Sequence, residues 1–427
     1  MIALVMFGVA LLLLLIGVPV AFAFGGVAMI FAFFTPDIGF EVFNVLSFRI
    51  FGIMSNQTLM AVPLFIMMGL ILEKSGMAEK LLLSMSALFG SVRGGLGVSV
   101  VLVGALLAAS TGIVSASVVM MSVITLPLML QAGYNKGLAT GTIAASGTLG
   151  QIIPPSIILI VLGDVMSISV GDLFKGAVLP GVVLVGLYIA YILLRAYLKP
   201  QDAPALQQEQ KITPVELLFA IVPPLMLMLF VLGSIFAGIA SPTESAAFGV
   251  MGGFILSFLN KKLSFDMLRY ALFETMKLSG MIFMILIGAT AFSLVFNELG
   301  GTDIILDFFS NDVGDVWAFI AISMFAIFIL GFFIDFIEIS FIIVPILVPI
   351  MEAFGIDPIW FAVLIAMNLQ ASFLTPPFGL SLFFIKGSAG DSVTTLDIYK
   401  GIIPFIVLQL IGLGLVVAFP ILVFAFL

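Results

Sequence analysis

The chain has 427 residues, of which 63% are hydrophobic and 9% are charged, a composition typical of a polytopic membrane protein. Its formal net charge of -8 argues against a binding surface for nucleic-acid phosphates. Because the chain contains no cysteine and no histidine, disulfides, thiol nucleophiles, His-ligated metals and imidazole catalysis are excluded. Several apolar runs reach the roughly 20 residues that cross a bilayer core about 30 Å thick, which predicts an all-α polytopic membrane fold.

The first half of the chain contains six predicted apolar segments, which cover residues 2–16, 18–34, 57–72, 95–131, 138–168 and 176–197. The start offers an Ala-Phe-Ala sequence that resembles a cleavage site, but it lacks the positive n-region of a signal peptide. We therefore interpret it as mature membrane helix. Residues 1–34 fit either two short crossings or one helix kinked at Gly17-Val18-Pro19, so the sequence leaves the side of the N-terminus open.

A polar segment rich in Gln, Pro and charge, residues 199–214, divides the chain almost in half and is predicted to be a linker. The second half again contains six apolar segments, which cover residues 215–238, 242–259, 278–296, 316–350, 358–385 and 402–427. We expect one repeat over residues 1–198 and a second over 215–427.

The two halves resemble each other at four places in the same order. The double proline Pro154-Pro155 recurs as Pro376-Pro377, and Pro127 recurs as Pro349 at the same offset along the chain. Two further pairs match at nearly that offset: PVAFAFG with PTESAAFG, and DLFKGAVLP with DIYKGIIP. One match would be weak because Pro and Gly are common in membrane helices, but four at nearly one offset predict an internal repeat.

The positive-inside rule orients the chain if the linker lies in the cytoplasm. The basic residues then placed inside are Lys74, Lys80, Arg93, Lys136, Arg195, Lys199, Lys211, Lys261, Lys262, Arg269, Lys277, Lys386 and Lys400, and only Arg49 and Lys175 fall outside. This arrangement requires segments 95–131 and 316–350 to be re-entrant hairpins that open on opposite sides. Opposite topology of two similar halves is the signature of an inverted-repeat transporter.

The double prolines predict broken helices, one over residues 138–168 and one over 358–385. Broken backbone at membrane depth is tolerated only where it is buried in protein or lines a wet cavity. Polar stretches precede both breaks, and polar turns lie in both hairpins. Their carbonyls and hydroxyls are suitable ligands for a hard monovalent cation such as Na⁺, and the free N–H groups of half-helices suit an anionic substrate. Two such pairs predict two or more Na⁺ sites beside one substrate site.

We assign ligand roles to individual residues of these polar stretches and hairpin turns. The candidate substrate ligands are Ser115, Ser117, Thr148, Gln151, Asp335, Gln370 and Ser372. The candidate Na⁺ ligands are Ser110, Thr111, Gly112, Ser146, Gly147, Gly150, Gly331, Asp335, Asn368, Thr375 and Pro376.

Simpler explanations stay open for several of these residues. A double proline can be only a kink, and the small residues at 110–117 can form a packing face between helices. Asp335 carries a charge that is costly in an apolar segment, which indicates function, but it can instead cap a helix at the wet edge of its hairpin. Glu338 is predicted to face the water outside. Glu244 is predicted to cap the helix that follows Pro242.

Six stretches together resemble the large membrane subunit of tripartite ATP-independent periplasmic (TRAP) transporters, within the ion-coupled elevator transporters. They are IGVPVAFAFG, STGIVSAS, GTLGQIIPPS, DLFKGAVLPG, SPTESAAFG and FLTPPFGLSLF. The resemblance spans essentially the whole chain. It implies Na⁺-driven uptake of an organic acid, sialic acid or a C4-dicarboxylate, across a bacterial inner membrane. It also implies a small membrane subunit and a periplasmic substrate-binding protein.

Three other functions compete with this one. A stand-alone dicarboxylate/Na⁺ symporter of the same superfamily would need no binding protein. An intramembrane protease is disfavoured because histidine, cysteine and a paired catalytic Asp motif are missing, although a Ser-Lys arrangement stays open. A passive channel is disfavoured because the sequence shows no rings of charge and no repeated filter sequence. We therefore expect a transporter rather than an enzyme.

Overall fold

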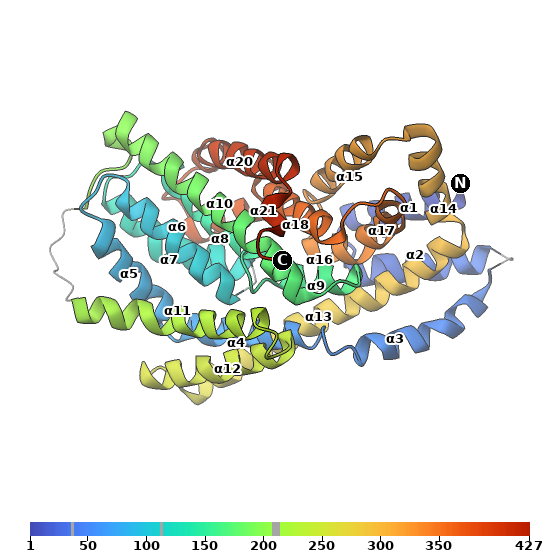
Figure 1. Ribbon diagram of the computed structural model, residues 1–427, viewed down its shortest axis with the longest axis horizontal. Helices are drawn as coiled ribbons and strands as arrows, with labels where there is room; N and C mark the ends of the chain where they lie inside the picture. Colours follow the sequence, from blue (N-terminus) through green and yellow to red (C-terminus); the bar gives the residue numbers. More distant parts are fainter. Residues whose placement is uncertain (36–37, 112–113, 207–213) are drawn as a thin grey trace.

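The computed structural model describes residues 1–35, 38–111, 114–206 and 214–427, and the regular secondary structure in these ranges is all helical (Figure 1). The helices of the first half are α1 (Ile2–Leu15), α2 (Val20–Phe34), α3 (Leu46–Met54), α4 (Ala61–Lys74), α5 (Met77–Phe89), α6 (Gly95–Thr111), α7 (Val114–Gln131), α8 (Lys136–Thr148), α9 (Ile157–Val165) and α10 (Val170–Leu198). Short 3₁₀ helices lie at Phe40–Val45, Leu149–Gln151 and Pro200–Asp202.

The second half repeats this order with different lengths. Its helices are α11 (Pro214–Phe236), α12 (Pro242–Leu259), α13 (Phe265–Glu298), α14 (Gly301–Asp307), α15 (Val316–Leu330), α16 (Phe336–Glu338), α17 (Val344–Ala353), α18 (Pro358–Leu374), α19 (Leu380–Ala389), α20 (Thr395–Ala418) and α21 (Ile421–Phe424). Two π-helical turns, Phe308–Val313 and Ile339–Ile343, adjoin α14 and α16.

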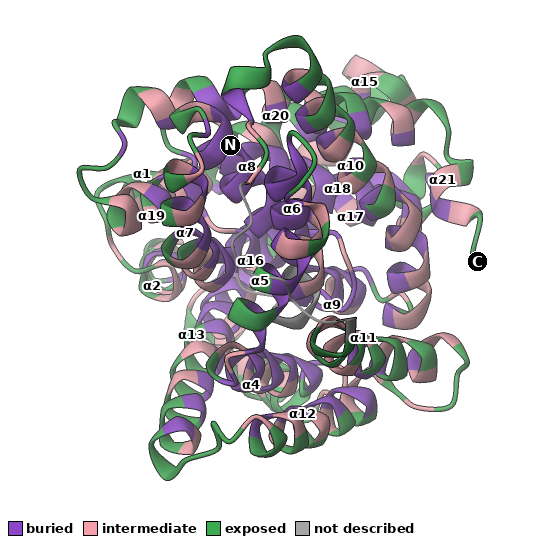
Figure 2. Cartoon of the chain, turned by 90° about the vertical axis from the view of Figure 1, so that its left-hand side faces the viewer, coloured by how far each residue is buried: buried purple, intermediate pink, exposed green. Residues whose placement is uncertain are grey.

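Helices from the two halves pack on each other in two groups. In the first, which we call the scaffold group, α2 packs on α13 and α12 packs on α4, with α11 beside α12. In the second, the core group, α8 packs on α6, α7 and α20, while α18 packs on α10, α15 and α20. The half-helices α9 and α19 belong to the core group too, since α9 packs on α18 and α19 packs on α7. Figure 2 shows α4, α11 and α12 below the helices of the core group.

The broken helices lie at the centre of the core group. Every residue of α8 from Leu138 to Thr148 is buried, and so is every residue of α18 from Trp360 to Leu374. A surface helix would bury only one stripe, so burial on all sides means that other helices surround both. The polar side chains on α8 and α18 therefore point into protein rather than lipid.

Glycines allow the tightest contacts between the two halves. A Cβ on Gly401 of α20 would overlap the backbone of Gly137 in α8, and a Cβ on Gly288 of α13 would overlap the backbone of Ala21 in α2. Small residues at such crossings let two backbones approach closely, which is how helices gain packing energy where lipid gives no hydrophobic driving force. Both contacts join one repeat to the other.

Seven helices among the described residues are long and apolar enough to cross a membrane, and the bent pair of α4 and α5 gives an eighth span if it is one crossing. The chain is thus a multi-pass membrane protein with the predicted fold: an inverted repeat with two helical hairpins, α6–α7 and α15–α17, and two helices broken at double prolines. The Pro154-Pro155 and Pro376-Pro377 bonds are cis, whereas Pro223-Pro224 lies inside the continuous helix α11.

The structure also changes several predicted elements. Residues 1–34 form two helices, α1 and α2, that pack on each other rather than one kinked helix. The predicted apolar segments omit α3 and α5, and they place the start of α13 at residue 278 instead of Phe265. Charged residues explain the differences at α5 and α13, since α5 is short and carries Glu79 and Lys80, and charges in the first half of α13 dilute its apolar signal.

Several basic residues that the positive-inside rule places in the cytoplasm lie at helix ends that contact one another. The Arg195 guanidinium lies 2.8 Å from the Asp202 carboxylate, and the backbone N–H of Asn135 donates to the Asp202 carbonyl. Lys80 donates to Asn260 Oδ1 at 2.6 Å, which brings it next to Lys261. These contacts join helix ends on one side, as the positive-inside rule requires of a cytoplasmic face.

The predicted cap at Glu244 is confirmed. Its carboxylate accepts from the backbone N–H of Ser241 at 2.8 Å, and the Ser241 hydroxyl accepts from the Glu244 N–H, which makes a capping box at the start of α12. Glu244 therefore stabilises the first turn of a scaffold helix.

Candidate functional site

In the first broken helix, a serine hydroxyl bonds a backbone carbonyl that the break leaves without its helical donor. Helix α8 stops at Thr148, residues 149–151 form one 3₁₀ turn, and α9 starts at Ile157 after the double proline. The Ser156 hydroxyl donates to the Gln151 carbonyl at 2.7 Å. Prolines remove the donors that this carbonyl would otherwise find in a continuous helix, so the hydroxyl replaces one of them.

The second broken helix has the same construction. Helix α18 ends at Leu374 and α19 begins at Leu380, with Pro376-Pro377 between them. The Ser381 hydroxyl donates to the Phe373 carbonyl at 2.7 Å, and Thr375 Oγ1 donates to the Ala371 carbonyl at 2.8 Å. Each break thus leaves a half-helix N-terminus, with α9 following a largely buried bend and α19 following a bend in which Pro377 and Phe378 are exposed.

The two breaks meet at a contact between Thr148 and Gln370. Gln370 Nε2 donates to Thr148 Oγ1 at 3.4 Å, and both residues are fully buried. They are 222 residues apart, which is also the offset of the double prolines, and they are therefore equivalent positions in the two repeats. Equivalent residues touch only where the axis relating the repeats passes between them. Two predicted substrate ligands thus lie at the centre of the inverted repeat.

Several buried polar atoms in this region have no hydrogen-bond partner among the described residues. They are both amide atoms of Gln151, Gln370 Oε1, the hydroxyl oxygens of Ser340 and Ser372, and Glu338 Oε2. A buried polar atom without a partner costs about 1–3 kcal/mol, so such a group indicates a ligand, an ion or water. Carbonyl, hydroxyl and carboxylate oxygens are the donor set that hard cations prefer.

The turn of the second hairpin packs directly on the second broken helix. A Cβ on Gly331 would overlap the Ser372 hydroxyl, so glycine allows the present close contact between the turn and α18. Asn368 Nδ2 donates to the Met324 carbonyl of α15 at 2.6 Å. These contacts bring together the predicted Na⁺ ligands Gly331 and Asn368 and the predicted substrate ligand Ser372.

The two acidic residues of this hairpin differ in their surroundings. Asp335 is half-buried and caps α16, with its Oδ1 accepting from the Phe336 N–H at 2.7 Å. Glu338, which the sequence predicts to face outside water, is instead 7% exposed and has one oxygen without a partner among the described residues. That prediction is wrong because α16 packs against α9 and α13, which cover the side chain.

A small cavity of about 80 Å³ brings the two hairpins together. Ser115 from the start of α7 and Asp335 from the second hairpin both line it, and the remaining walls are Val114, Phe336, Phe373, Leu380 and Phe384. Leu380 is the first residue of α19, so the cavity reaches the N-terminus of that half-helix. A carboxylate and the positive end of a helix therefore face one space, which suits a cation and an anion bound side by side.

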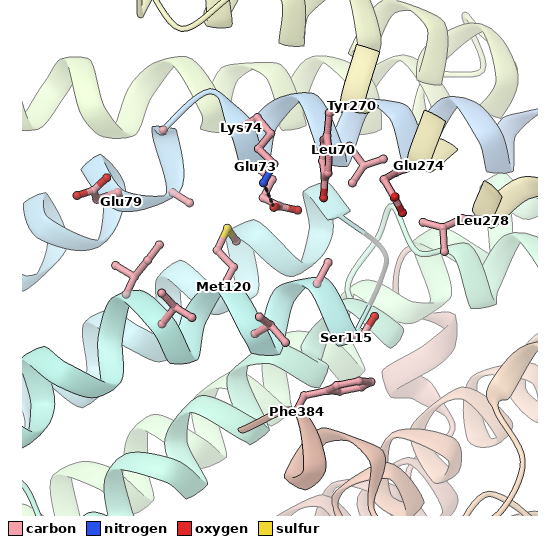
Figure 3. A pocket seen from close by; sticks show the side chains of 16 residues that line it. Leu70, Glu73, Lys74, Glu79, Ser115, Met120, Tyr270, Glu274, Leu278 and Phe384 are labelled. Atoms are coloured by element: carbon pink, nitrogen blue, oxygen red, sulfur yellow. Dashed lines mark ion pairs between the residues drawn. The ribbon is translucent and has the colours of Figure 1, made fainter. Parts of the chain in front are cut away.

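This cavity adjoins a much larger cleft of about 640 Å³ between the scaffold and core groups (Figure 3). Ser115 and Phe384 line both spaces. The scaffold wall carries Glu73, Lys74 and Tyr270, with the Lys74 ammonium 4.4 Å from the centre of the Tyr270 ring. Because Gly76, which also lines the cleft, lies beside Lys262, the cleft opens at the basic end of the molecule.

The remaining predicted ligands do not gather at one point, and several of them have a role in local structure. The side chains of Ser110 and Thr111, and all of Gly112, lie outside the described residues. Ser117 and Ser146 are buried, and Ser146 Oγ donates to the Thr142 carbonyl at 2.6 Å. Gly147 packs against Val118 of α7, so its lack of a side chain serves helix packing. Gly150 lies in the first bend, and Pro376 lies half-buried in the second.

Sequence reasoning missed a contact between the scaffold group and the core group. Asn56, in the loop before α4, donates from Nδ2 to Asp164 Oδ1 in the last turn of α9. Asp164 precedes Lys386 by the same offset that separates the two double prolines. The internal repeat thus identifies Asp164 and Lys386 as equivalent charged positions, but the sequence does not predict that Asp164 contacts Asn56.

Two inverted halves whose broken helices and hairpins meet on a common axis define a membrane transporter of the inverted-repeat class. The chain belongs to a specific family of that class: the model of the tripartite ATP-independent periplasmic transporter DctM component matches residues 7–422. The resemblance seen in the sequence motifs is confirmed.

Individual relatives are about equally similar. The chain is 29% identical to the C4-dicarboxylate TRAP transporter large permease protein DctM of Rhodobacter capsulatus, with 98% of this chain and 97% of the relative covered. It is 27% identical to the sialic acid TRAP transporter large permease protein SiaM of Vibrio cholerae, covering 96% and 94%. It is 29% identical to the ectoine TRAP transporter large permease protein TeaC of Halomonas elongata, covering 96% and 95%.

A solved structure shows the same fold. The Alcanivorax borkumensis YdaH transporter superposes with a TM-score of 0.64 over 99% of each chain, at 14% sequence identity. At that identity the likeness concerns the fold alone.

Proposed function

We propose that this chain is the large membrane subunit of a Na⁺-coupled transporter that imports an organic acid, sialic acid or a C4-dicarboxylate, across the bacterial inner membrane by an elevator movement. A small membrane subunit and a periplasmic binding protein that delivers the substrate complete the proposed system. The observation that carries this proposal is the cavity shared by the two hairpins, with its carboxylate and its half-helix N-terminus.

The charges around the cavity support coupling to cations. Among the described residues, its lining contains Asp335 and no lysine or arginine. An organic anion bound beside a carboxylate would be repelled unless positive charge came with it, and the N-terminus of α19 supplies only about half a charge. Bound Na⁺ would supply the rest, with the Asp335 carboxylate among its ligands.

The size of the cavity supports a substrate position at its junction with the cleft. About 80 Å³ holds only a few water molecules, whereas sites for small organic ligands occupy about 300–1,000 Å³. The cleft supplies the missing space through Ser115 and Phe384, which border both. The substrate would therefore contact the hairpin on one side and the open cleft on the other.

The division into two helix groups supports an elevator movement. The cleft separates α7 and α19 of the core group from α4 and α13 of the scaffold group, and it opens at the basic end. If that end is cytoplasmic, the structure corresponds to the inward-facing state. The core group would carry the site to the other side by sliding along the scaffold group.

Uptake into proteoliposomes tests the proposal. The chain would be reconstituted with its small subunit, and radiolabelled sialic acid and C4-dicarboxylates would be supplied with the binding protein. Uptake should require an inward Na⁺ gradient and proceed without ATP. Undiminished uptake with K⁺ in place of Na⁺ on both sides would contradict Na⁺ coupling, and full uptake without the binding protein would favour the stand-alone symporter instead.

A further inference from the structure

One hydrogen bond joins the scaffold group to the core group at the end away from the cleft. Asn56 Nδ2 donates to Asp164 Oδ1. The Asn56 amide is fixed in this orientation because its Oδ1 accepts the backbone N–H groups of Thr58 at 2.9 Å and Leu59 at 3.3 Å. Both partners are half-buried, so water competes little for the bond.

The position of this bond matters for movement. Asn56 precedes α4, and the other end of α4 carries Glu73 and Lys74, which line the cleft. A helix of 14 residues is about 21 Å long, so the bond and the cleft mouth lie at opposite ends of the scaffold. Beside the cleft, α7 and α19 stand apart from α4 and α13, although α4 also packs on α6.

The internal repeat assigns a counterpart to Asp164. Lys386 follows it at the offset of the double prolines and lies in the last turn of α19, as Asp164 lies in the last turn of α9. In this structure Lys386 Nζ donates to the carbonyls of Gly390 at 2.6 Å and Val393 at 3.0 Å, in the loop between α19 and α20. Its side chain is therefore bonded within the core group.

The opposite wall of the cleft supplies a partner for this lysine. Phe384, two residues before Lys386 in α19, lines the cleft on the core side. Glu73 and Glu274 line it on the scaffold side, where they now pair with Lys74 at 3.3 Å and Lys277 at 3.7 Å, so Lys386 would share or replace these partners. Movement that closes the cleft would carry the end of α19 toward these carboxylates. The same sliding would displace α9 along the scaffold group and so separate Asp164 from Asn56.

We infer that Asn56–Asp164 and Lys386 with Glu73 or Glu274 form two latches that close alternately, the first in the state seen here and the second when the cleft is shut. This inference rests on the proposed elevator movement and adds the residues that hold each end state. A hydrogen bond to a charged group contributes enough to shift a two-state equilibrium about tenfold to a hundredfold.

Cysteine labelling can measure the equilibrium because the chain contains no cysteine. A single Val123→Cys, at a residue that lines the cleft and is 57% exposed, would report the open cleft to a charged maleimide. Leu198→Cys, 65% exposed at the end of α10, is the matched control outside the cleft. Both would be studied in the complete transporter in membrane vesicles.

Two substitutions separate the latches. Asn56→Asp keeps an oxygen that accepts the N–H groups of Thr58 and Leu59, so α4 stays capped, but it places a second carboxylate beside Asp164. Lys386→Gln keeps a donor for the loop carbonyls of Gly390 and Val393 but removes the charge that would meet Glu73 or Glu274.

Asn56→Asp should slow labelling of Val123→Cys about tenfold or more, and adding Lys386→Gln should restore it, with labelling of Leu198→Cys unchanged throughout. Labelling of the single variant at the parent rate, or a double variant as slow as the single one, would overturn the inference. If the parent shows Na⁺-driven uptake and either of these two contrary results is obtained, only the inference about the latches is contradicted. A parent without Na⁺-driven uptake contradicts the proposed function itself.

Discussion

Replacing Asp335 by Asn isolates the charge of the carboxylate that lines the cavity. The amide keeps an oxygen in place of Oδ1, so the cap on the Phe336 N–H at 2.7 Å can persist. Shape and local structure are therefore nearly unchanged, whereas one negative charge is lost from the cavity.

The size of the cavity sets the magnitude. A space of about 80 Å³ is only about 5 Å across, so a monovalent cation inside it would lie within about 5 Å of this carboxylate. At an effective dielectric constant of about 20, two unit charges at about 5 Å interact by roughly 3 kcal/mol. Removing the charge should raise the Na⁺ concentration for half-maximal uptake by about a hundredfold.

Na⁺ titration of substrate uptake in proteoliposomes measures this effect. Asp357→Asn is the matched control, because Asp357 also caps a helix, accepting from the Trp360 N–H at 2.9 Å, but is exposed and does not line the cavity. The control should titrate like the parent. An unchanged Na⁺ requirement in Asp335→Asn would show that this residue only caps α16 and would refute its assignment as an ion ligand.

Three further outcomes are expected. Gly331→Ala would push a methyl group into the Ser372 hydroxyl and should reduce uptake severely. Gly387→Ala, which has open space at its Cβ position, is the control and should not reduce uptake. Equal uptake by both variants would contradict a tight hairpin contact. Gly401→Val would overpack the crossing of α20 and α8 and lower the free energy of unfolding by about 1–3 kcal/mol or more. The unfolding temperature in detergent should fall accordingly. Gly414→Val, on the same helix but with open space at its Cβ position, should leave that temperature unchanged. Dissipating the Na⁺ gradient with an ionophore should abolish accumulation even where ATP is present, and accumulation that survives would point to another energy source.

The helix breaks and the hairpins are the parts of the fold that the sequence predicts best, because each depends on a local signal. Double prolines at 154–155 and 376–377 remove backbone donors and interrupt their helices. Pro223-Pro224 lies inside the continuous helix α11, so the bends are predictable only from a double proline together with the polar stretch and the repeat around it. Apolar runs locate the hairpins for a similar reason, since each run is long enough to cross much of the bilayer. Helix α5 escapes prediction because it is short and bears Glu79 and Lys80, which break the apolar signal although the helix packs on α6 and α11.

Properties that depend on tertiary packing are harder to predict. Glu338 is expected in water because a carboxylate in a hairpin has no local signal for burial, and only the packing of α9 and α13 covers it. The contact between Thr148 and Gln370 is predictable in principle, since both are separate candidates and their separation equals the repeat offset. The partner of Asn56 depends on the relative placement of two helix groups, which no spacing in the sequence encodes.

The contact between Thr148 and Gln370 also bears on how such a chain could arise by duplication. Residues on a two-fold axis meet their own copies, so before the halves were fused this position would have faced itself in two identical polypeptides. The crossings of α2 with α13 and of α8 with α20 join one half to the other, and a single half would leave these surfaces without a partner. The ancestor of this fold is therefore best pictured as a dimer of one short protein inserted in both orientations, whose two central side chains have since diverged to a threonine and a glutamine.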